Sequence, residues 1–261
     1  MKYFLITFGC QMNTSDSEKI AEVFEKSGYK SASNINEADL VLVNMCSVRQ
    51  SAVNRVYGVV EKLKTLPAEK TGRQVKSVLT GCILKKDRKK FEKLFDLILD
   101  SKNLKNWLKE LQYHKLVCGT KNLKIESKEP KTAFVPIMTG CNNFCSYCVV
   151  PYTRGREISR PTEEIICEVK KLAKNGIKEI WLLGQNVNSY ENGFSKLLKK
   201  INKIPGKFWI RFTSSHPKDF SDDLIEVMKS CEKITPYLNL PVQAGDYKIL
   251  KKMNRPYTIA Q

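Results

Sequence analysis

Three cysteines within eight residues are the part of this sequence best suited to chemistry. Cys141, Cys145 and Cys148 have the spacing C-x3-C-x2-C. A structural zinc ion takes four ligands, and a four-iron cluster is normally held by four thiolates. Apart from these three, no Cys or His lies between Cys118 and Cys167. The spacing therefore favours an iron–sulfur cluster with one open iron over a zinc knuckle.

A second group of cysteines is spread along the first third of the chain. Cys10, Cys46 and Cys82 each follow an apolar stretch that predicts a β-strand. In an open parallel sheet the carboxyl ends of the strands lie along one edge, where ligands bind. We therefore predict that these thiols converge on a second cluster with three protein ligands. The alternative is that they only pack in the core, as we expect for Cys167 and Cys231.

The predicted elements of the N-terminal half alternate between strand and helix. A capping-box pattern at Ser15 and Glu18 predicts that the first helix starts there. The predicted strands are residues 3–9, 39–44, 75–80 and 95–99, and the predicted helices include residues 15–26, 48–66 and 104–111. This alternation predicts an α/β fold in which helices flank an open parallel sheet.

The C-terminal half repeats the alternation and has polar residues where its strands end. The predicted strands are residues 134–138, 178–183, 208–212 and 238–243, and the predicted helices are residues 162–175 and 246–253. These units predict a barrel-like sheet whose strand exits bind a cofactor. The predicted cofactor contacts are Gly184, Gln185, Asn186, Arg211, Ser214 and Gln243. For His216 we expect a structural or cofactor-contact role rather than a catalytic one.

A short basic segment follows the C-x3-C-x2-C loop. Arg154, Arg156 and Arg160 lie within seven residues, among Gly and Pro. The planar guanidinium suits phosphate groups, so these side chains are candidate substrate contacts, and a solvated loop is the alternative. A polar, Lys-rich stretch over residues 113–131 predicts a boundary between domains of residues 1–126 and 127–261.

The formal net charge of +18 favours a polyanionic partner, nucleic acid first, although a Lys-rich genome composition is an alternative source of the charge. No apolar run approaches the ~20 residues that cross a bilayer. The first ten residues briefly resemble a lipoprotein signal, but their apolar core is short and mixed, so we predict a strand there and a cytoplasmic protein without a membrane partner. In a reducing compartment nine cysteines are better suited to ligation than to disulfides.

The combined motifs resemble the radical S-adenosylmethionine methylthiotransferase family along essentially the whole chain. The segments that carry the resemblance are residues 10–13 (CQMN), 140–148 (GCNNFCSYC), 151–157 (PYTRGRE), 183–190 (LGQNVNSY), 215–220 (SHPKDF) and 240–243 (LPVQ). The similarity leans towards the tRNA branch that acts on isopentenyladenosine beside the anticodon. The threonylcarbamoyladenosine branch and the branch that acts on a ribosomal-protein aspartate are alternatives.

The resemblance implies a flavodoxin-like N-terminal domain and a radical S-adenosylmethionine partial (β/α) barrel. It implies that Cys141, Cys145 and Cys148 hold the 4Fe-4S cluster that cleaves S-adenosylmethionine, with Tyr147 packed beside the adenine. The other three cysteines would hold an auxiliary 4Fe-4S cluster whose open iron carries the sulfur. One cofactor molecule would methylate this sulfur, and a second would yield the radical that removes hydrogen from carbon 2 of the adenine.

No general acid–base residue is prominent, as expected where the cofactor makes the difficult bond change. The resemblance also implies an external electron donor such as flavodoxin or ferredoxin, and we expect a monomer. Family members continue into further βα units and an RNA-binding β-domain, whereas this sequence stops at Gln261. We therefore expect an incomplete barrel and poor turnover. A two-cluster electron-transfer protein and a basic zinc module that binds RNA are alternatives from other classes.

Overall fold

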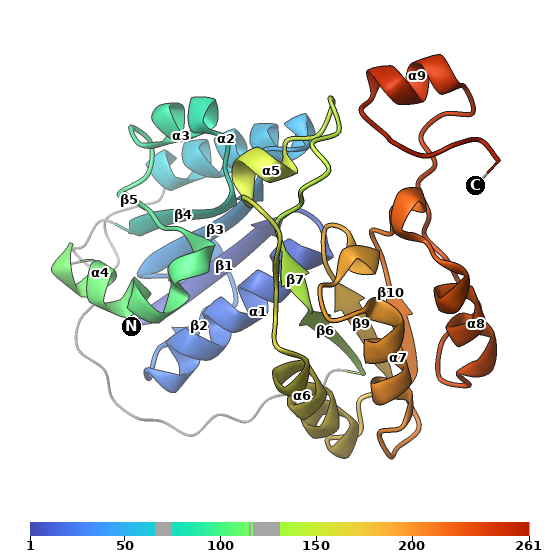
Figure 1. Cartoon of the computed structure of the whole chain (residues 1–261). Coiled ribbons are helices and arrows are strands. Elements are labelled where there is room, and N and C mark those ends of the chain that lie inside the picture. Colours follow the sequence, from blue (N-terminus) through green and yellow to red (C-terminus); the bar gives the residue numbers. More distant parts are fainter. Residues whose placement is uncertain (66–74, 115, 117–130, 261) are drawn as a thin grey trace. The chain divides into compact units, whose positions relative to one another are not determined.

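The chain divides into two compact units, Met1–Ser127 and Lys128–Gln261. A computed structural model describes residues 1–65, 75–114, 116 and 131–260 (Figure 1). The predicted boundary at residues 126/127 and most of the predicted linker lie outside the described residues. Within these residues, no helix combines the length and apolar character that crossing a membrane requires.

The first unit is built on a parallel sheet with the strand order β2-β1-β3-β4-β5. Its strands are β1 (Lys2–Phe8), β2 (Lys30–Ser31), β3 (Leu40–Cys46), β4 (Lys76–Cys82) and β5 (Leu97–Ile98). All seven residues of β3 are buried, because helices cover both faces of the sheet. The predicted parallel α/β fold of this half is confirmed.

Two helices pack on each face of this sheet (Figure 1). Leu40 and Leu42 of β3 belong to a core that contains residues of α1 (Gln11–Lys26) and α4 (Trp107–Tyr113). The alternate residues Val41 and Val43 belong to a core shared with α2 (Gln50–Thr65) and α3 (Lys85–Phe91). This alternation follows from the two-residue period of a strand. Two 3-10 helices, Ile35–Glu37 and Ser101–Asn106, complete the connections.

The first helix starts four residues earlier than its capping-box pattern predicts. Cys10 is the N-cap residue, with extended backbone angles, and its backbone N–H donates to Oδ1 of Asn13 at 3.4 Å. Ser15 and Ser17 instead lie buried inside α1. The prediction was wrong because an Asn three residues into the helix performs the reciprocal capping that the S-x-x-E pattern suggested further along.

The second unit has a three-stranded parallel sheet with the order β10-β9-β6. Its strands are β6 (Thr132–Pro136), β9 (Glu179–Leu183) and β10 (Trp209–Phe212), and a short antiparallel pair joins β7 (Met138–Thr139) to β8 (Ile158–Ser159). The helices are α5 (Val150–Thr153), α6 (Thr162–Lys174), α7 (Phe194–Asn202), α8 (Asp222–Ser230) and α9 (Tyr247–Lys252), with 3-10 turns at Val187–Ser189 and Pro217–Asp219. One core cluster joins α6, α7 and α8 to the sheet.

The predicted strand over residues 238–243 does not form. The chain adds one parallel bridge to the sheet, from Ile210 to Ile234, and then leaves it. Pro236 and Pro241 lack the N–H that a sheet ladder needs, and Val242 is 56% exposed. The predicted helix that follows does form as α9, and its N-cap Asp246 accepts a hydrogen bond from the backbone N–H of Ile249 at 2.9 Å.

Candidate functional site

The sheet of the first unit brings its three thiols to one edge. Cys46 and Cys82 are the last residues of β3 and β4, and the strand register places them opposite each other. Both side chains are 5% exposed. Cys10 lies two residues beyond β1, whose final residue is in register with Met45, and its side chain is exposed. The three cysteines therefore mark the carboxyl ends of three adjacent strands.

A buried amide network supports this edge. Asn13 and Asn44 are fully buried, and Nδ2 of Asn13 donates to Oδ1 of Asn44 at 2.9 Å and to the carbonyl of Met45 at 3.1 Å. Nδ2 of Asn44 returns a bond to the carbonyl of Asn13 at 2.8 Å. Oδ1 of Asn13 also lies 3.5 Å from Sγ of Cys10. The network therefore links the Cys10 turn to the strand that ends in Cys46.

Close packing beside the network requires glycine at two positions. A Cβ on Gly9 would lie 2.3 Å from Oδ1 of Asn13. A Cβ on Gly81 would lie 2.2 Å from the carbonyl of Met45, and its φ of +109° is a conformation that favours glycine. Sequence reasoning treated Asn13 only as part of a motif and Asn44 as a strand end, so it missed the pair.

The C-x3-C-x2-C loop of the second unit starts directly after β7. Gly140 has a φ of +80°, and a Cβ there would lie 2.0 Å from the carbonyl oxygen of Arg156. The backbone N–H of Cys141 donates to the carbonyl of Gly155 at 3.2 Å. Phe144 adopts a positive φ of 48°, which is uncommon for a residue with a bulky side chain. The loop is therefore held in one conformation by its own backbone and by residues 155–156.

The environment of these thiols is largely buried. Cys141 and Cys145 are 8% and 9% exposed, and Cys148 is half-buried. Burial raises the pKa of the Cys141 and Cys148 thiols, and the nearby Arg255 partly offsets this effect at Cys148. Among the described residues, no group of three or more Cys, His, Asp or Glu side chains is arranged so that it could hold a metal ion, and this applies to both sets of cysteines.

Several predicted cofactor contacts lie around the cluster loop and the carboxyl edge of the sheet. The side-chain Oε1 of Gln185 accepts a hydrogen bond from the backbone N–H of Gly140 at 2.6 Å. A Cβ on Gly184 would lie 2.7 Å from Cγ of Met138. Tyr147 is 48% exposed, which leaves one side of its ring open.

Of the other predicted cofactor contacts, Ser214 and Gln243 have an unusual backbone conformation, and Arg211 already interacts with other side chains. Ser214 and Gln243 have positive φ angles of 65° and 67°. Arg211 lies on β10, in register with Trp181, and its guanidinium is 5.2 Å from the centre of that ring. It also forms an ion pair with Glu179, so it is already engaged within the protein.

Three buried polar atoms at this edge have no hydrogen-bond partner in the part of the chain that the structure describes. They are Oδ1 of Asn186, Oγ of Ser215 and Nε2 of His216. The three side chains are 1%, 3% and 5% exposed. Because an unsatisfied buried polar group costs about 1–3 kcal/mol, these atoms fit a site that is completed by a polar ligand.

His216 is held as a neutral imidazole whose Nε2 is the nitrogen without a partner among the described residues. Its Nδ1 accepts a hydrogen bond from the backbone N–H of Lys218 at 3.2 Å, so Nε2 carries the proton. Burial lowers the pKa of His216 to about 4, with a further lowering from Arg255. A neutral buried imidazole of this kind can donate a hydrogen bond but is a poor base.

The three candidate phosphate-binding arginines make different contacts within the protein. Arg160 donates to the carbonyl of Pro136 at 2.5 Å and to the Glu168 carboxylate at 2.7 Å, so its guanidinium is engaged in holding α6 to the sheet. The Arg156 guanidinium lies 4.4 Å from the centre of the Phe144 ring and thus packs on the cluster loop. Arg154 is the C-cap residue of α5.

Sequence reasoning missed the segment that follows α9. The carbonyl of Met253 accepts a hydrogen bond from the backbone N–H of Ser146 at 3.1 Å. Nδ2 of Asn254 donates to the carbonyls of Asn143 and Phe144, each at 3.0 Å. The segment therefore contacts the cluster loop, although about 110 residues separate the two in the sequence. The only sequence signal was an Arg within the N-R-P-Y run of a chain whose basic residues are mostly Lys.

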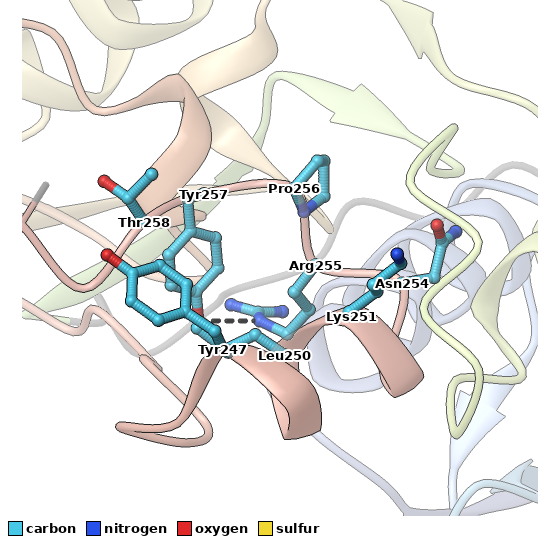
Figure 2. A pocket seen from close by; sticks show the side chains of 8 residues that line it. All are labelled: Tyr247, Leu250, Lys251, Asn254, Arg255, Pro256, Tyr257 and Thr258. Carbon is cyan, nitrogen blue, oxygen red and sulfur yellow. Dashed lines mark hydrogen bonds between the residues drawn. The ribbon is translucent and has the colours of Figure 1, made fainter.

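Arg255 is at the centre of this segment, and it lines a cavity of about 410 Å³ with residues of α9 (Figure 2). Its Nη1 donates to the hydroxyl of Tyr147 at 3.1 Å and lies 3.6 Å from Sγ of Cys145. Its Nη2 donates to the carbonyl of Pro241 at 2.7 Å, and its Nε donates to the hydroxyl of Tyr257 at 2.9 Å. One side chain thus ties the cluster loop to the segment around residue 241.

Of the two other residues that we expected to pack in the core, only one does so. Cys231 is 8% exposed and belongs to the core cluster of the second unit. Cys167 is exposed on α6 and lines a separate cavity with Lys170 and Lys200, so the packing prediction was wrong for it. Cys167 lies two residues from the buried Ile165 and Val169, which places it on the opposite side of α6 from the core.

Comparison with known proteins defines the class of both units. Residues 135–261 match the Radical SAM superfamily, and residues 2–100 match the family described as Uncharacterized protein family UPF0004. The structure is similar to TsrM from Kitasatospora setae, a radical S-adenosylmethionine methyltransferase, with a TM-score of 0.69 and 12% identity over 99% of this chain and 65% of that one. At this low identity the likeness shows the fold alone. The second unit is a radical S-adenosylmethionine domain.

Curated relatives narrow the class further. The chain is 45% identical to a tRNA-2-methylthio-N(6)-dimethylallyladenosine synthase from Acetivibrio thermocellus, with 98% of this chain and 58% of the relative aligned. Proteins of the same name from Caldicellulosiruptor saccharolyticus and Clostridioides difficile are 44% and 43% identical, over 59% and 58% of their lengths. The chain belongs to the radical S-adenosylmethionine methylthiotransferase family. It spans a little under 60% of the length of these relatives.

Proposed function

We propose that this chain acts in tRNA modification by placing a methylthio group on carbon 2 of N6-isopentenyladenosine next to the anticodon. The observation that carries the proposal is the set of three cysteines in each unit, at the carboxyl ends of three adjacent parallel strands in the first and in the loop after β7 in the second. The name of the relatives above, tRNA-2-methylthio-N(6)-dimethylallyladenosine synthase, supports this branch over the threonylcarbamoyladenosine branch and the ribosomal-protein branch.

In this proposal Cys141, Cys145 and Cys148 hold the 4Fe-4S cluster that binds S-adenosylmethionine. The edge formed by Asn186, Ser215 and His216 suits the polar parts of that cofactor, since each side chain has a buried atom without a partner among the described residues. When bound, the two clusters and S-adenosylmethionine would supply the radical and the methylated sulfur. The protein contributes binding, orientation and exclusion of water.

The three cysteines of the first unit hold the auxiliary 4Fe-4S cluster in this proposal. Their strand register and the Asn13–Asn44 network preform the site, because folding has already brought strands distant in sequence together. Three thiolates leave one coordination position of a four-iron cluster free for sulfur. No residue of this unit is needed as an acid or a base.

The remaining parts of the proposal concern partners. The net charge of +18 suits the tRNA backbone. The cluster needs an external one-electron donor, such as flavodoxin or ferredoxin. We propose that the protein acts as a monomer in the cytoplasm.

The proposal is tested with the chain reconstituted with iron and sulfide without oxygen. We would incubate it with S-adenosylmethionine, a reductant and tRNA that carries N6-isopentenyladenosine, and analyse the nucleosides by mass spectrometry. We expect the 2-methylthio product from the wild type and from Cys167→Ala, whose cysteine lies outside both sites. We expect none from Cys141→Ala or Cys82→Ala.

Two further readouts separate the competing functions. An electron-transfer protein would be reduced without forming 5′-deoxyadenosine, whereas the proposed enzyme forms it when Cys141 is intact. Zinc in place of iron and sulfide after reconstitution would favour an RNA-binding zinc module. If the loaded chain cleaves S-adenosylmethionine but leaves the tRNA unchanged, this tRNA is not its substrate and the proposal is wrong.

A further inference from the structure

We propose that Arg255 is a positioning residue that fixes the C-x3-C-x2-C loop and raises the reduction potential of the cluster bound there. This inference rests on the proposed function in one respect, because it requires a cluster on Cys141, Cys145 and Cys148. It extends that function by assigning a role to a residue that is not itself a ligand.

All three guanidinium nitrogens of Arg255 make polar contacts. Its side chain makes the four contacts described above, two of them to the cluster loop at Cys145 and Tyr147. Figure 2 shows the guanidinium beside the hydroxyl end of Tyr257, with the hydrogen bond between them drawn. Tyr257 is anchored in turn through its hydroxyl, which donates to the carbonyl of Val242. The guanidinium is therefore held from several sides and cannot easily swing away from the loop.

The charge of Arg255 is the more informative feature. The residue is 5% exposed, and guanidinium groups remain protonated in proteins. Within the described residues, its partners are two tyrosine hydroxyls, a carbonyl and a thiol, and no carboxylate forms an ion pair with it. An unpaired buried charge is costly, so a negative group is expected beside it. The thiolate of Cys145 and the cluster that it would ligate provide that negative charge.

The consequence for the cluster follows from its change of charge. Reduction adds one negative charge, and hydrogen bonds to the ligating sulfurs, together with local charge, set the reduction potential. A buried cation 3.6 Å from Sγ of Cys145 stabilises the reduced state more than the oxidised state. Arg255 therefore makes the cluster easier to reduce, and its contact with Tyr147 links this effect to the residue expected beside the adenine.

The experiment is a redox titration followed by electron paramagnetic resonance. It uses the full chain with Cys10, Cys46 and Cys82 replaced by Ala, so that only one cluster titrates. In this background we compare Arg255 with Arg255→Met, Arg255→Lys and the control Lys251→Met. Lys251 lines the same cavity, so its removal deletes a positive charge from the same segment without deleting a contact to a cysteine.

We expect Arg255→Met to lower the ratio of reduced to oxidised cluster at least tenfold at a given potential, which for one electron is about 59 mV. Arg255→Lys keeps the charge but not the fork, so its midpoint should lie between those of Arg255→Met and the parent. Lys251→Met should match the parent.

A midpoint equal to the parent in either Arg255 variant that retains its iron would overturn the inference. Arg255→Lys decides the matter if Arg255→Met takes up no cluster. If the parent chain itself binds no cluster on these three cysteines, the proposed function is what fails.

Discussion

Replacing His216 with Asn should remove a pH-dependent part of the stability of the second unit. His216 is 5% exposed, and burial lowers its pKa to about 4 from an ordinary value of 6.5. The charged groups that act on it are Arg255 and Lys218, which lower its pKa further, and Asp219, which raises it. The folded protein thus keeps this imidazole neutral at pH values where the unfolded chain would protonate it.

The sign and the size of the effect follow from linkage. Between pH 6.5 and about 4 the unfolded chain binds a proton at His216 that the folded chain does not, so the free energy of unfolding falls as the pH falls. The contribution is fully present above pH 6.5. The difference between 6.5 and about 4, at about 1.36 kcal/mol per pH unit, corresponds to about 3 kcal/mol across that window.

The assay is urea unfolding at pH 7.5, 6 and 5, followed by tryptophan fluorescence. In a Trp107→Phe background the remaining tryptophans, Trp181 and Trp209, both lie in the second unit and report its unfolding. His216→Asn should show a shallower loss of stability towards pH 5 than the parent. His114→Asn, which removes the other, exposed histidine of the chain, should behave like the parent. Equal pH dependence in the parent and His216→Asn would refute the reasoning.

Three further substitutions test the supporting structure. Asn13→Ala leaves Oδ1 of Asn44 and the buried carbonyl of Met45 without their donor, so urea unfolding of the first unit should show a loss of about 2–4 kcal/mol, and a loss below 0.5 kcal/mol would count against the network. Gly140→Ala drives a Cβ into the Arg156 carbonyl, so reconstitution should yield less iron per chain, with Gly176→Ala as a control in open space at a similar φ. Arg160→Ala should lower the stability of the second unit by about 1–3 kcal/mol with little change in tRNA affinity, and a loss of affinity alone would restore its predicted substrate role.

Local sequence patterns were sufficient to predict most of the strands and their parallel arrangement. The stretch that became β3 is a continuous apolar run because helices cover both of its faces, and such a run is visible without knowledge of its neighbours. The run over residues 238–243 is less apolar, since it contains Asn239, Pro241 and Gln243, and it lies outside the sheet. Pro241 lacks the N–H that a sheet ladder needs, so a residue type already argued against a strand there.

The cysteine spacing could be recognised from the sequence, but the side chains that support it could not. Asn13 and Asn44 meet because α1, which follows β1, packs beside the adjacent strand β3 and so brings residues 31 positions apart together. Arg255 reaches Cys145 across 110 positions. A single Arg after a short helix has no periodicity, and its role appears only when the loop that it contacts has been placed in space.

Backbone strain and unsatisfied polar atoms in the second unit point to the same region. The non-glycine residues with positive φ in the described chain are Phe144, Ser214, Gln243 and Asn254. Phe144 lies in the cluster loop, Asn254 contacts that loop, and Ser214 precedes Ser215, whose buried hydroxyl has no partner among the described residues. Each such conformation costs about 1–3 kcal/mol unless the surroundings impose it, and such strain concentrates at ligand sites. A fold without a ligand to bind would gain stability by relaxing these residues, so the strained Phe144 within the cluster loop and Asn254 against it are an argument that this loop is built around a bound group.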